Sequence, residues 1–301
     1  MNDAPQVSEK ESPFKKIKVQ DFKTSTCLVL SSGGVKGIYI LGAIQYLFET
    51  YGLDHITCYY GTSIGAIIGG LLIIGYTPIE LLVYICVQKI MACLVSTFHI
   101  ANILTEKQFL DSKIFTHMLQ KIIIDKIGYI PTLENLYEKF KKKLCIVTIS
   151  KNDLTQPLYV SHESHPNWTL DQVLQMSSAI PFVFRCQCED VEYIDGGLLD
   201  PFPILHAAHR EKQVFGINIY RKLESSENML WELYNMLYVP IQFIEHINKK
   251  KVERGSYIEL VTQGEQTTKQ NKTLLLMFIS GYQQCKLKLQ EHPKVVKVKT
   301  D

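Results

Sequence analysis

The segment of residues 56–70 is the feature that most constrains how this chain folds. It opens with β-branched and aromatic residues, continues as Gly-Thr-Ser-Ile-Gly, and ends in small and apolar residues suited to a buried helix. This pattern predicts a strand, a sharp turn and a helix, with the hydroxyl of Ser63 presented on a strained turn at a helix N-terminus. Gly61 and Gly65 suit the turn because side chains there would collide where strand and helix close up. The same small residues also let a helix pack tightly. The Gly-Thr-Ser-Ile-Gly pattern therefore indicates a nucleophile only if other residues can supply oxyanion donors and a base.

A second unit of the same kind precedes this corner. Residues 27–30 form a continuous apolar run of strand length, typical of a strand buried on both faces of its sheet. A glycine loop follows at 31–37, and apolar residues then recur at helical spacing from Ile40 to Phe48. Further strands are predicted at 144–149, 157–161, 214–219 and 257–261, and further helices at 79–89, 105–124, 133–142, 170–176, 227–250 and 273–290. This alternation predicts an α/β fold with a mainly parallel central sheet wrapped by helices.

The pattern indicates one large domain with loose ends. The chain has 301 residues, and its hydrophobic content of 46% supplies a full core. Residues 1–22 are polar and rich in lysine, which predicts a flexible N-terminal arm, and residues 292–301 form a basic tail. Residues 23–291 then make up the domain. Within it, residues 90–104 are strongly apolar but irregular, which fits either part of the core or a lid.

Charge and cysteine usage exclude several classes of function. A formal net charge of +2 without a basic stripe argues against a nucleic-acid binder, although small lysine clusters favour weak contact with an anionic membrane surface. Eight cysteines without a Cys-x-x-Cys pair are typical of a reduced, intracellular protein. Cys186 and Cys188 form the one close pair, but no histidine cluster accompanies them at ligand spacing. We therefore expect no metal and no cofactor.

No charged residue occurs between His55 and Glu80, a length that would cross a bilayer. Six glycines or prolines interrupt this stretch, and the serine corner lies within it. A helix buried against a sheet explains the stretch better than a membrane span does.

A serine nucleophile needs donors for the oxyanion that it creates. Gly33 and Gly34 follow the first predicted strand and begin a helix, so their backbone N–H groups are free of side-chain obstruction. The alternative is a phosphate-binding loop. However, Ser32 stands where Gly-x-Gly-x-x-Gly needs its first glycine, and no Gly-Lys-Ser or Gly-Lys-Thr occurs there. We favour the oxyanion hole because the serine corner lies downstream.

The nucleophile also needs a base to take its proton. Asp195 ends a short apolar run and is followed by Gly196 and Gly197, so an acid is held at the mouth of a loop. Asp-Gly-Gly by itself is most often a turn. An ordinary triad is the rival, in which Ser63 would act with an aspartate and one of four histidines, namely His162, His165, His206 and His209.

Taken together, these motifs make the chain resemble the patatin-like phospholipase family. The resemblance rests on Gly-Gly-x-Lys-Gly at 33–37, Gly-Thr-Ser-Ile-Gly at 61–65 and Asp-Gly-Gly at 195–197, in that order. The stretch 177–182 and the closing pair 281–282 also look like the family, so the similarity covers about residues 25 to 290.

The resemblance implies a three-layer α/β/α sandwich and a Ser–Asp dyad without histidine. In it, Ser63 would attack an ester carbonyl, Asp195 would serve as the base, and the amides of Gly33 and Gly34 would hold the oxyanion. Lys36 matches the basic residue of the family's glycine loop. Supporting positions of the three motifs are Gly37, Gly61, Gly65, Gly196 and Gly197. Two departures occur: Ser32 replaces the leading glycine, and Asp200 stands where many members carry asparagine.

The function implied is that of a lipid acyl hydrolase of phospholipase A type. Its substrates would be phospholipids or other acyl lipids at a membrane or lipid-droplet surface, reached by a cytoplasmic, peripherally associated protein. Some family members need a protein activator. A non-catalytic protein that binds a lipid surface or a partner is the main alternative, and acyl transfer to an acceptor other than water would need the same residues.

Overall fold

The computed structural model describes residues 19–88, 112–181, 183, 185–221, 229–252, 255–262 and 271–290. The apolar segment 90–104, the first part of the helix predicted at 105–124, and the basic tail 292–301 lie outside the described residues.

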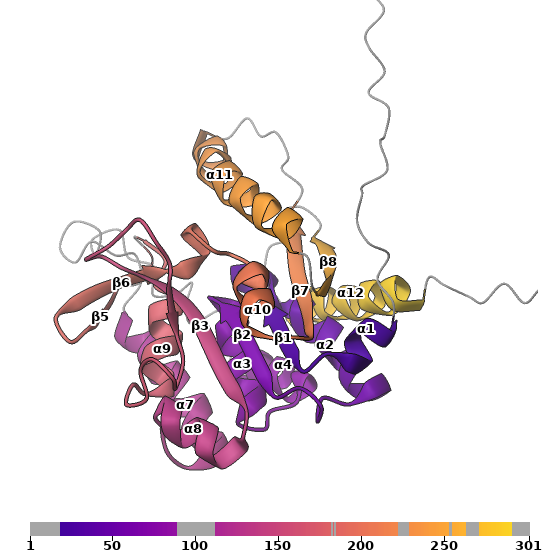
Figure 1. Ribbon diagram of the computed structural model, residues 1–301, viewed down its shortest axis with the longest axis horizontal. Coiled ribbons are helices and arrows are strands. Elements are labelled where there is room, and N and C mark those ends of the chain that lie inside the picture. The colour runs from indigo at the N-terminus through magenta and orange to yellow at the C-terminus, as the bar shows by residue number, and fades with distance from the viewer. Residues whose placement is uncertain are drawn as a thin grey trace, which may run out of the picture.

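Within the described residues, one sheet of eight strands forms the centre of the molecule (Figure 1). Its order is β5-β6-β3-β2-β1-β7-β8, with β4 paired to β3. The strands β3, β2, β1, β7 and β8 are parallel neighbours, whereas β4, β6 and β5 add antiparallel pairs at one side. Their bounds are β1 Cys27–Leu30, β2 Cys58–Thr62, β3 Lys143–Ser150, β4 Leu158–Val160, β5 Cys186–Cys188, β6 Val191–Asp195, β7 Val214–Arg221 and β8 Ser256–Thr262.

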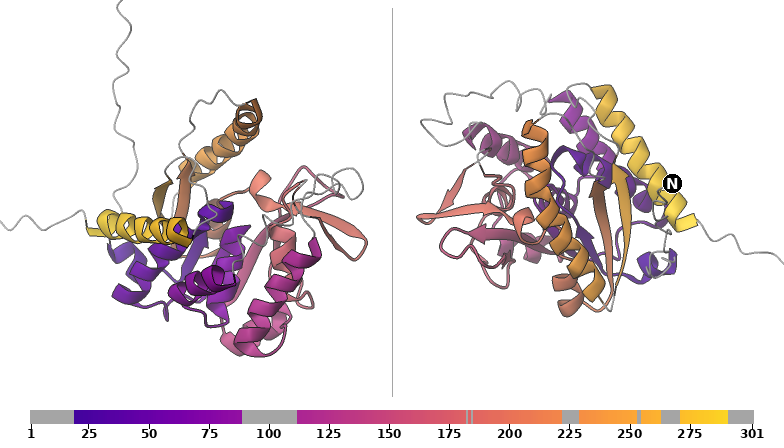
Figure 2. Two further views of the ribbon diagram at one scale, coloured as in Figure 1. Left: turned by 180° about the vertical axis from the view of Figure 1, so that it is seen from behind. Right: turned by 90° about the horizontal axis from the view of Figure 1, so that it is seen from above.

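Helices cover both faces of this sheet. Side chains such as Leu28 and Tyr59 pack into the larger core with α2, α3 and α12, while their neighbours Val29 and Tyr60 pack against α10 on the other face. Figure 2 shows α11 and α12 on opposite sides of the β7–β8 edge. The α-helices are α1 Val19–Thr24, α2 Gly37–Tyr51, α3 Ile64–Ile73, α4 Pro78–Val87, α7 Ser112–Ile127, α8 Leu133–Phe140, α9 Leu170–Ser177, α10 Ile204–Arg210, α11 Met229–Lys251 and α12 Asn271–Gln290, and the 3-10 helices are η1 Gly34–Lys36 and η2 Gly196–Leu198. The expected α/β/α sandwich around a mainly parallel sheet is confirmed.

The folded part begins earlier than the composition indicates. Helix α1 starts at Val19, inside the segment 1–22 that is predicted to be a flexible arm. Phe22 is fully buried and makes an edge-to-face contact with Phe215 of β7, with ring centroids 5.2 Å apart. Burial of an aromatic ring of this size offsets the cost of ordering a short polar helix.

The uncharged stretch before Glu80 contains strand β2, helix α3 and the start of helix α4 rather than one long helix. Among the described residues, no single helix is long and apolar enough to span a membrane. Helices α3 and α4 pass that test only as a pair, and the pair is bent by 116° at the break between them.

Candidate active site

The serine corner forms a sharp elbow at the carboxyl end of β2. Ser63 lies between β2 and α3 with φ of 56° and ψ of −122°, a backbone conformation that a residue with a side chain rarely adopts. A Cβ atom at Gly65 would overlap the carbonyl oxygens of Leu30 and Ser31, and one at Gly61 would lie 2.5 Å from the amide nitrogen of Ala66. The elbow is therefore closed tightly against the end of β1, as the glycine spacing predicts.

The structure brings Ser63 and Asp195 together. Asp195 is the last residue of β6, which pairs with β3 beside β2. Its Oδ2 atom accepts a hydrogen bond of 2.6 Å from Ser63 Oγ, and its Oδ1 atom accepts one of 2.7 Å from the amide of Gly197. Both Ser63 and Asp195 are buried, with 5% and 6% of their surfaces exposed. This geometry gives a serine hydroxyl a direct proton acceptor.

Burial raises the pKa of Asp195 to about 6, although the hydrogen bonds from Ser63 and Gly197 favour the carboxylate. A carboxylate with such a pKa is ionised at neutral pH and is a stronger base than a solvated aspartate.

A role of Asp195 as the base for Ser63 predicts that ester hydrolysis rises with pH through a midpoint of about 6, because a protonated carboxyl has no place for the Ser63 proton. The measurement is kcat/KM for a soluble short-chain ester between about pH 4.5 and about pH 9. Asp200, whose pKa burial also raises to about 6, supplies the control: Asp200→Asn should keep the acid limb. A profile that stays flat down to about pH 4.5 would contradict a raised pKa at the base.

The glycine loop lies beside both catalytic candidates. A Cβ at Gly37 would overlap the side chain of Ile64, the residue after Ser63, and one at Gly197 would lie 3.3 Å from Cβ of Ser32. The loop therefore runs between the serine elbow and the acid loop. Gly34 has φ of 54°, which suits glycine, and nothing lies within 4 Å of where its Cβ would be.

Backbone donors are present in this loop. The first hydrogen bond of η1 runs from the amide of Lys36 to the carbonyl of Gly33. The amides of Gly33 and Gly34 lie before it in the chain, so the hydrogen bonds of this helix do not use them. Lys36 Nζ in turn contacts Thr262 Oγ1 at the end of β8, at 3.2 Å. This contact ties the loop to a strand that lies two strands away from β1.

Sequence reasoning missed the contacts made by Ser32 and Asp200, the two departures from the family pattern. The amide of Ser32 donates to the carbonyl of Pro201, and the carbonyl of Asp200 accepts from Thr62 Oγ1 at 2.9 Å. The buried Asp200 carboxyl accepts a 2.8 Å hydrogen bond from Tyr159 of β4. These contacts connect the acid loop to Thr62, the residue before Ser63. No local sequence pattern signals them, because they join segments far apart in the chain.

The four candidate histidines have other neighbours. His206 stacks on Tyr159 with ring centroids 3.5 Å apart, and burial, together with nearby positive charges, lowers its pKa to about 4. His162 stacks on the ring of Tyr137. His165 Nδ1 lies 2.9 Å from Ser164 Oγ, and His209 is exposed at the end of α10. None of these rings hydrogen-bonds Ser63 or Asp195 in the part of the chain that the structure describes.

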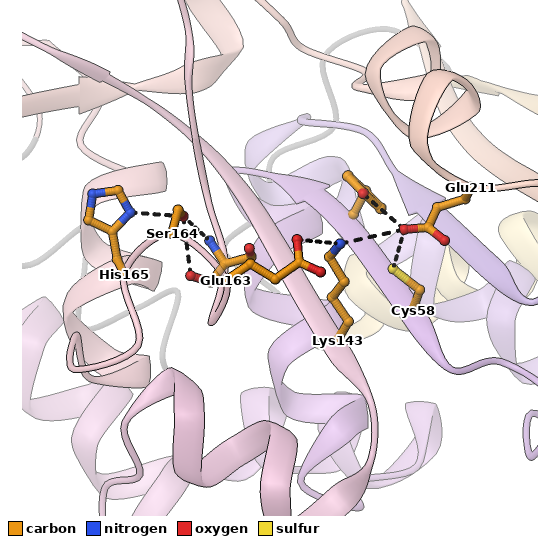
Figure 3. A network of polar contacts seen from close by, with 8 residues as sticks. Cys58, Lys143, Glu163, Ser164, His165 and Glu211 are labelled. Carbon is orange, nitrogen blue, oxygen red and sulfur yellow. Dashed lines mark hydrogen bonds and ion pairs between the residues drawn. The ribbon is translucent and has the colours of Figure 1, made fainter.

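A second polar network lies at the opposite end of the sheet (Figure 3). Lys143 Nζ lies 3.0 Å from Glu163 and 3.6 Å from Glu211, and Glu211 also accepts hydrogen bonds from Tyr60 and Cys58. Cys58 and Lys143 begin β2 and β3, whereas ligand sites of parallel sheets lie at the carboxyl ends of strands. We interpret this network as structural.

No group of three or more metal-ligating side chains is found among the residues described. Cys186 is a buried free thiol on β5, and burial raises its pKa to about 12, which disfavours the thiolate that metals bind.

Comparison with known proteins assigns the chain to one family. The model of the family described as patatin-like phospholipase matches residues 28–208. A probable lipid hydrolase of Invertebrate iridescent virus 6 is 28% identical over 191 residues, which cover 62% of this chain and 64% of that protein. An uncharacterized protein of Acanthamoeba polyphaga mimivirus is 26% identical over 72% of this chain and 71% of its own length. The chain thus spans about two thirds of the length of these viral relatives.

Two solved structures share the fold. VipD from Legionella pneumophila matches with a TM-score of 0.56 and 18% identity, over 89% of this chain and 67% of that one. ExoU from Pseudomonas aeruginosa, in its heterodimeric complex with SpcU, matches with a TM-score of 0.51 and 15% identity, over 89% of this chain and 51% of that one.

Proposed function

The chain belongs to the patatin-like phospholipase family, and we propose that it is a lipid acyl hydrolase of phospholipase A type acting through Ser63 and Asp195. The observation that carries the proposal is the direct hydrogen bond of 2.6 Å between the hydroxyl on the strained elbow and a buried carboxylate. The viral relative described as a probable lipid hydrolase supports an ester substrate of lipid type.

In the proposed reaction, Ser63 Oγ attacks the ester carbonyl while its proton moves to Asp195. The amides of Gly33 and Gly34 stabilise the resulting oxyanion, and collapse of the tetrahedral intermediate expels the alcohol, which takes the proton from Asp195. Asp195 then accepts a proton from water as the water attacks the acyl-enzyme carbonyl. Collapse of this second tetrahedral intermediate breaks the bond to Ser63 Oγ and releases the fatty acid, and Ser63 Oγ takes the proton back from Asp195. Because a base with a pKa of about 6 is a modest one, the oxyanion donors supply a large share of the rate enhancement.

Apolar side chains beside the acid loop support a lipid substrate. Leu198 lies in η2 directly after the Asp-Gly-Gly turn and is 39% exposed. Ile180 is 38% exposed, and its neighbour Ala179 accepts the amide hydrogen of Asp195. We propose that the enzyme reaches its substrate by peripheral contact with a membrane or lipid-droplet surface. A protein activator is a further partner that we propose, and the structure of ExoU in a heterodimeric complex with SpcU supports binding of a protein to this fold.

The test is labelling with a fluorophosphonate probe, followed by peptide mapping, alongside product analysis of phosphatidylcholine vesicles with and without cell extract. We expect one labelled residue, Ser63, and release of free fatty acid. Transfer of the acyl group to an added alcohol instead of water would assign acyl transfer to the same residues. Vesicle binding without labelling or product under all conditions would overturn the proposal in favour of a non-catalytic lipid-binding protein.

A further inference from the structure

The residue that fixes the backbone of the elbow comes from a distant helix. Ser177 is the last residue of α9, and none of its surface is exposed. Its Oγ atom accepts a 2.8 Å hydrogen bond from the amide of Ser63 and donates a 2.7 Å hydrogen bond to the carbonyl of Val147 in β3. One hydroxyl thus bridges the proposed nucleophile and the central sheet.

This bridge acts where the backbone is under strain. Ser63 has φ of 56° and ψ of −122°, and such a conformation persists only when its surroundings hold it. A buried amide without a partner would add a further cost. The Ser177 hydroxyl satisfies that amide and therefore favours the strained conformation over a relaxed one.

The bridge also sets the nucleophile relative to the acid. Val147 is the register partner of Thr62, the residue before the nucleophile. A Cβ at Gly196, directly after Asp195, would overlap the Val147 carbonyl oxygen, so the acid loop packs on the same peptide. Ser177 therefore connects Ser63 to the peptide on which the acid loop rests.

We propose that Ser177 is a positioning residue that holds the Ser63 hydroxyl within reach of Asp195. This inference rests on the proposed function.

The chain offers a matched control in the next residue. Ser178 is also buried, but its Oγ has no hydrogen-bond partner among the described residues. Ser177→Ala and Ser178→Ala remove the same atom from adjacent positions. Comparing their activities distinguishes the effect of losing the bridge from the effect of losing any buried hydroxyl.

The experiment compares wild type, Ser177→Ala and Ser178→Ala by the rate of fluorophosphonate labelling and by kcat and KM for a soluble ester. In Ser177→Ala we expect kcat and the labelling rate to fall by about 30-fold to 100-fold, because a small displacement of a reacting atom has effects of that order. KM should change by less than about twofold. The acid limb of the pH profile should keep its midpoint, since no hydrogen bond joins Ser177 to Asp195 among the described residues. Ser178→Ala should stay within about twofold of wild type.

Ser177→Cys keeps the shape of the side chain with a somewhat larger atom in place of Oγ, and the thiol donates and accepts hydrogen bonds weakly, so we expect an intermediate loss of about 3-fold to 10-fold. It serves as the readout if Ser177→Ala does not fold. Equal kinetics for wild type and the folded Ser177 variants, or equal losses at Ser177 and Ser178, would overturn the positioning role alone. A folded wild type that neither labels at Ser63 nor hydrolyses any ester would instead overturn the proposed function.

Discussion

Ser63→Ala is expected to lower ester hydrolysis by about 10⁴-fold or more, because loss of the nucleophile in a serine hydrolase removes covalent catalysis and leaves only binding and oxyanion stabilisation. The protein should still fold, since alanine at φ of 56° is no more strained than the serine that it replaces. The measurement is fatty-acid release from phosphatidylcholine vesicles and hydrolysis of a soluble ester, with circular dichroism to check the fold.

Binding to the same vesicles is the control for this variant. The side chain of Ser63 is buried, so loss of its hydroxyl should leave the outer surface and vesicle binding unchanged. Retention of more than about one hundredth of the wild-type rate by a folded Ser63→Ala would place the nucleophile elsewhere.

Asp195→Asn is expected to lower kcat by about 10³-fold or more, because an amide of nearly the same shape cannot accept the Ser63 proton. The four histidines supply the control. Single changes at His162, His165, His206 and His209, each to glutamine, should keep activity within about threefold, since none of these rings hydrogen-bonds Ser63 or Asp195 among the described residues. A collapse at one histidine, with Asp195→Asn still active, would replace the dyad by a triad.

The same variant should be more stable than wild type at neutral pH. The pKa of Asp195 is raised from 3.8 to about 6, so the folded state binds this proton more tightly than the unfolded chain does. This carboxyl therefore favours folding most below about pH 4, and that contribution is lost as the pH rises through about 6. The amide of Asp195→Asn does not titrate, so the gain in stability of at most about 3 kcal/mol should appear at about pH 8 and shrink toward about pH 4. Thermal unfolding at the two pH values measures it.

The fold was readable from the sequence because it depends on local patterns. The apolar runs at 27–30 and 144–149 predict strands buried on both faces, and β1 and β3 lie there. The antiparallel part was less visible: β5 is three residues long and carries no alternating pattern. The predicted arm ends at residue 22, whereas helix α1 starts at Val19. The composition does not show this start, because Phe22 packs on Phe215, which lies far along the chain.

The site was readable only in part. The elbow residues and the Asp-Gly-Gly turn carry their own backbone requirements, so the amino-acid pattern alone identifies Ser63, Gly65 and Asp195 as candidates. Their catalytic roles, and that of the oxyanion donors, stay predictions. The segment 90–104, for which a lid is one interpretation, lies outside the described residues.

What the sequence by itself determined is the set of short-range constraints: buried strands, a glycine-closed corner at Ser63, and an acid before two glycines. What only the tertiary structure decided is which groups meet. The separation of 132 residues between Ser63 and Asp195 is closed by pairing of β6 with β3, and the hydroxyl of Ser177 reaches the elbow because α9 ends beside that strand. Contacts of this kind depend on the packing of the whole sheet, and no local pattern encodes them.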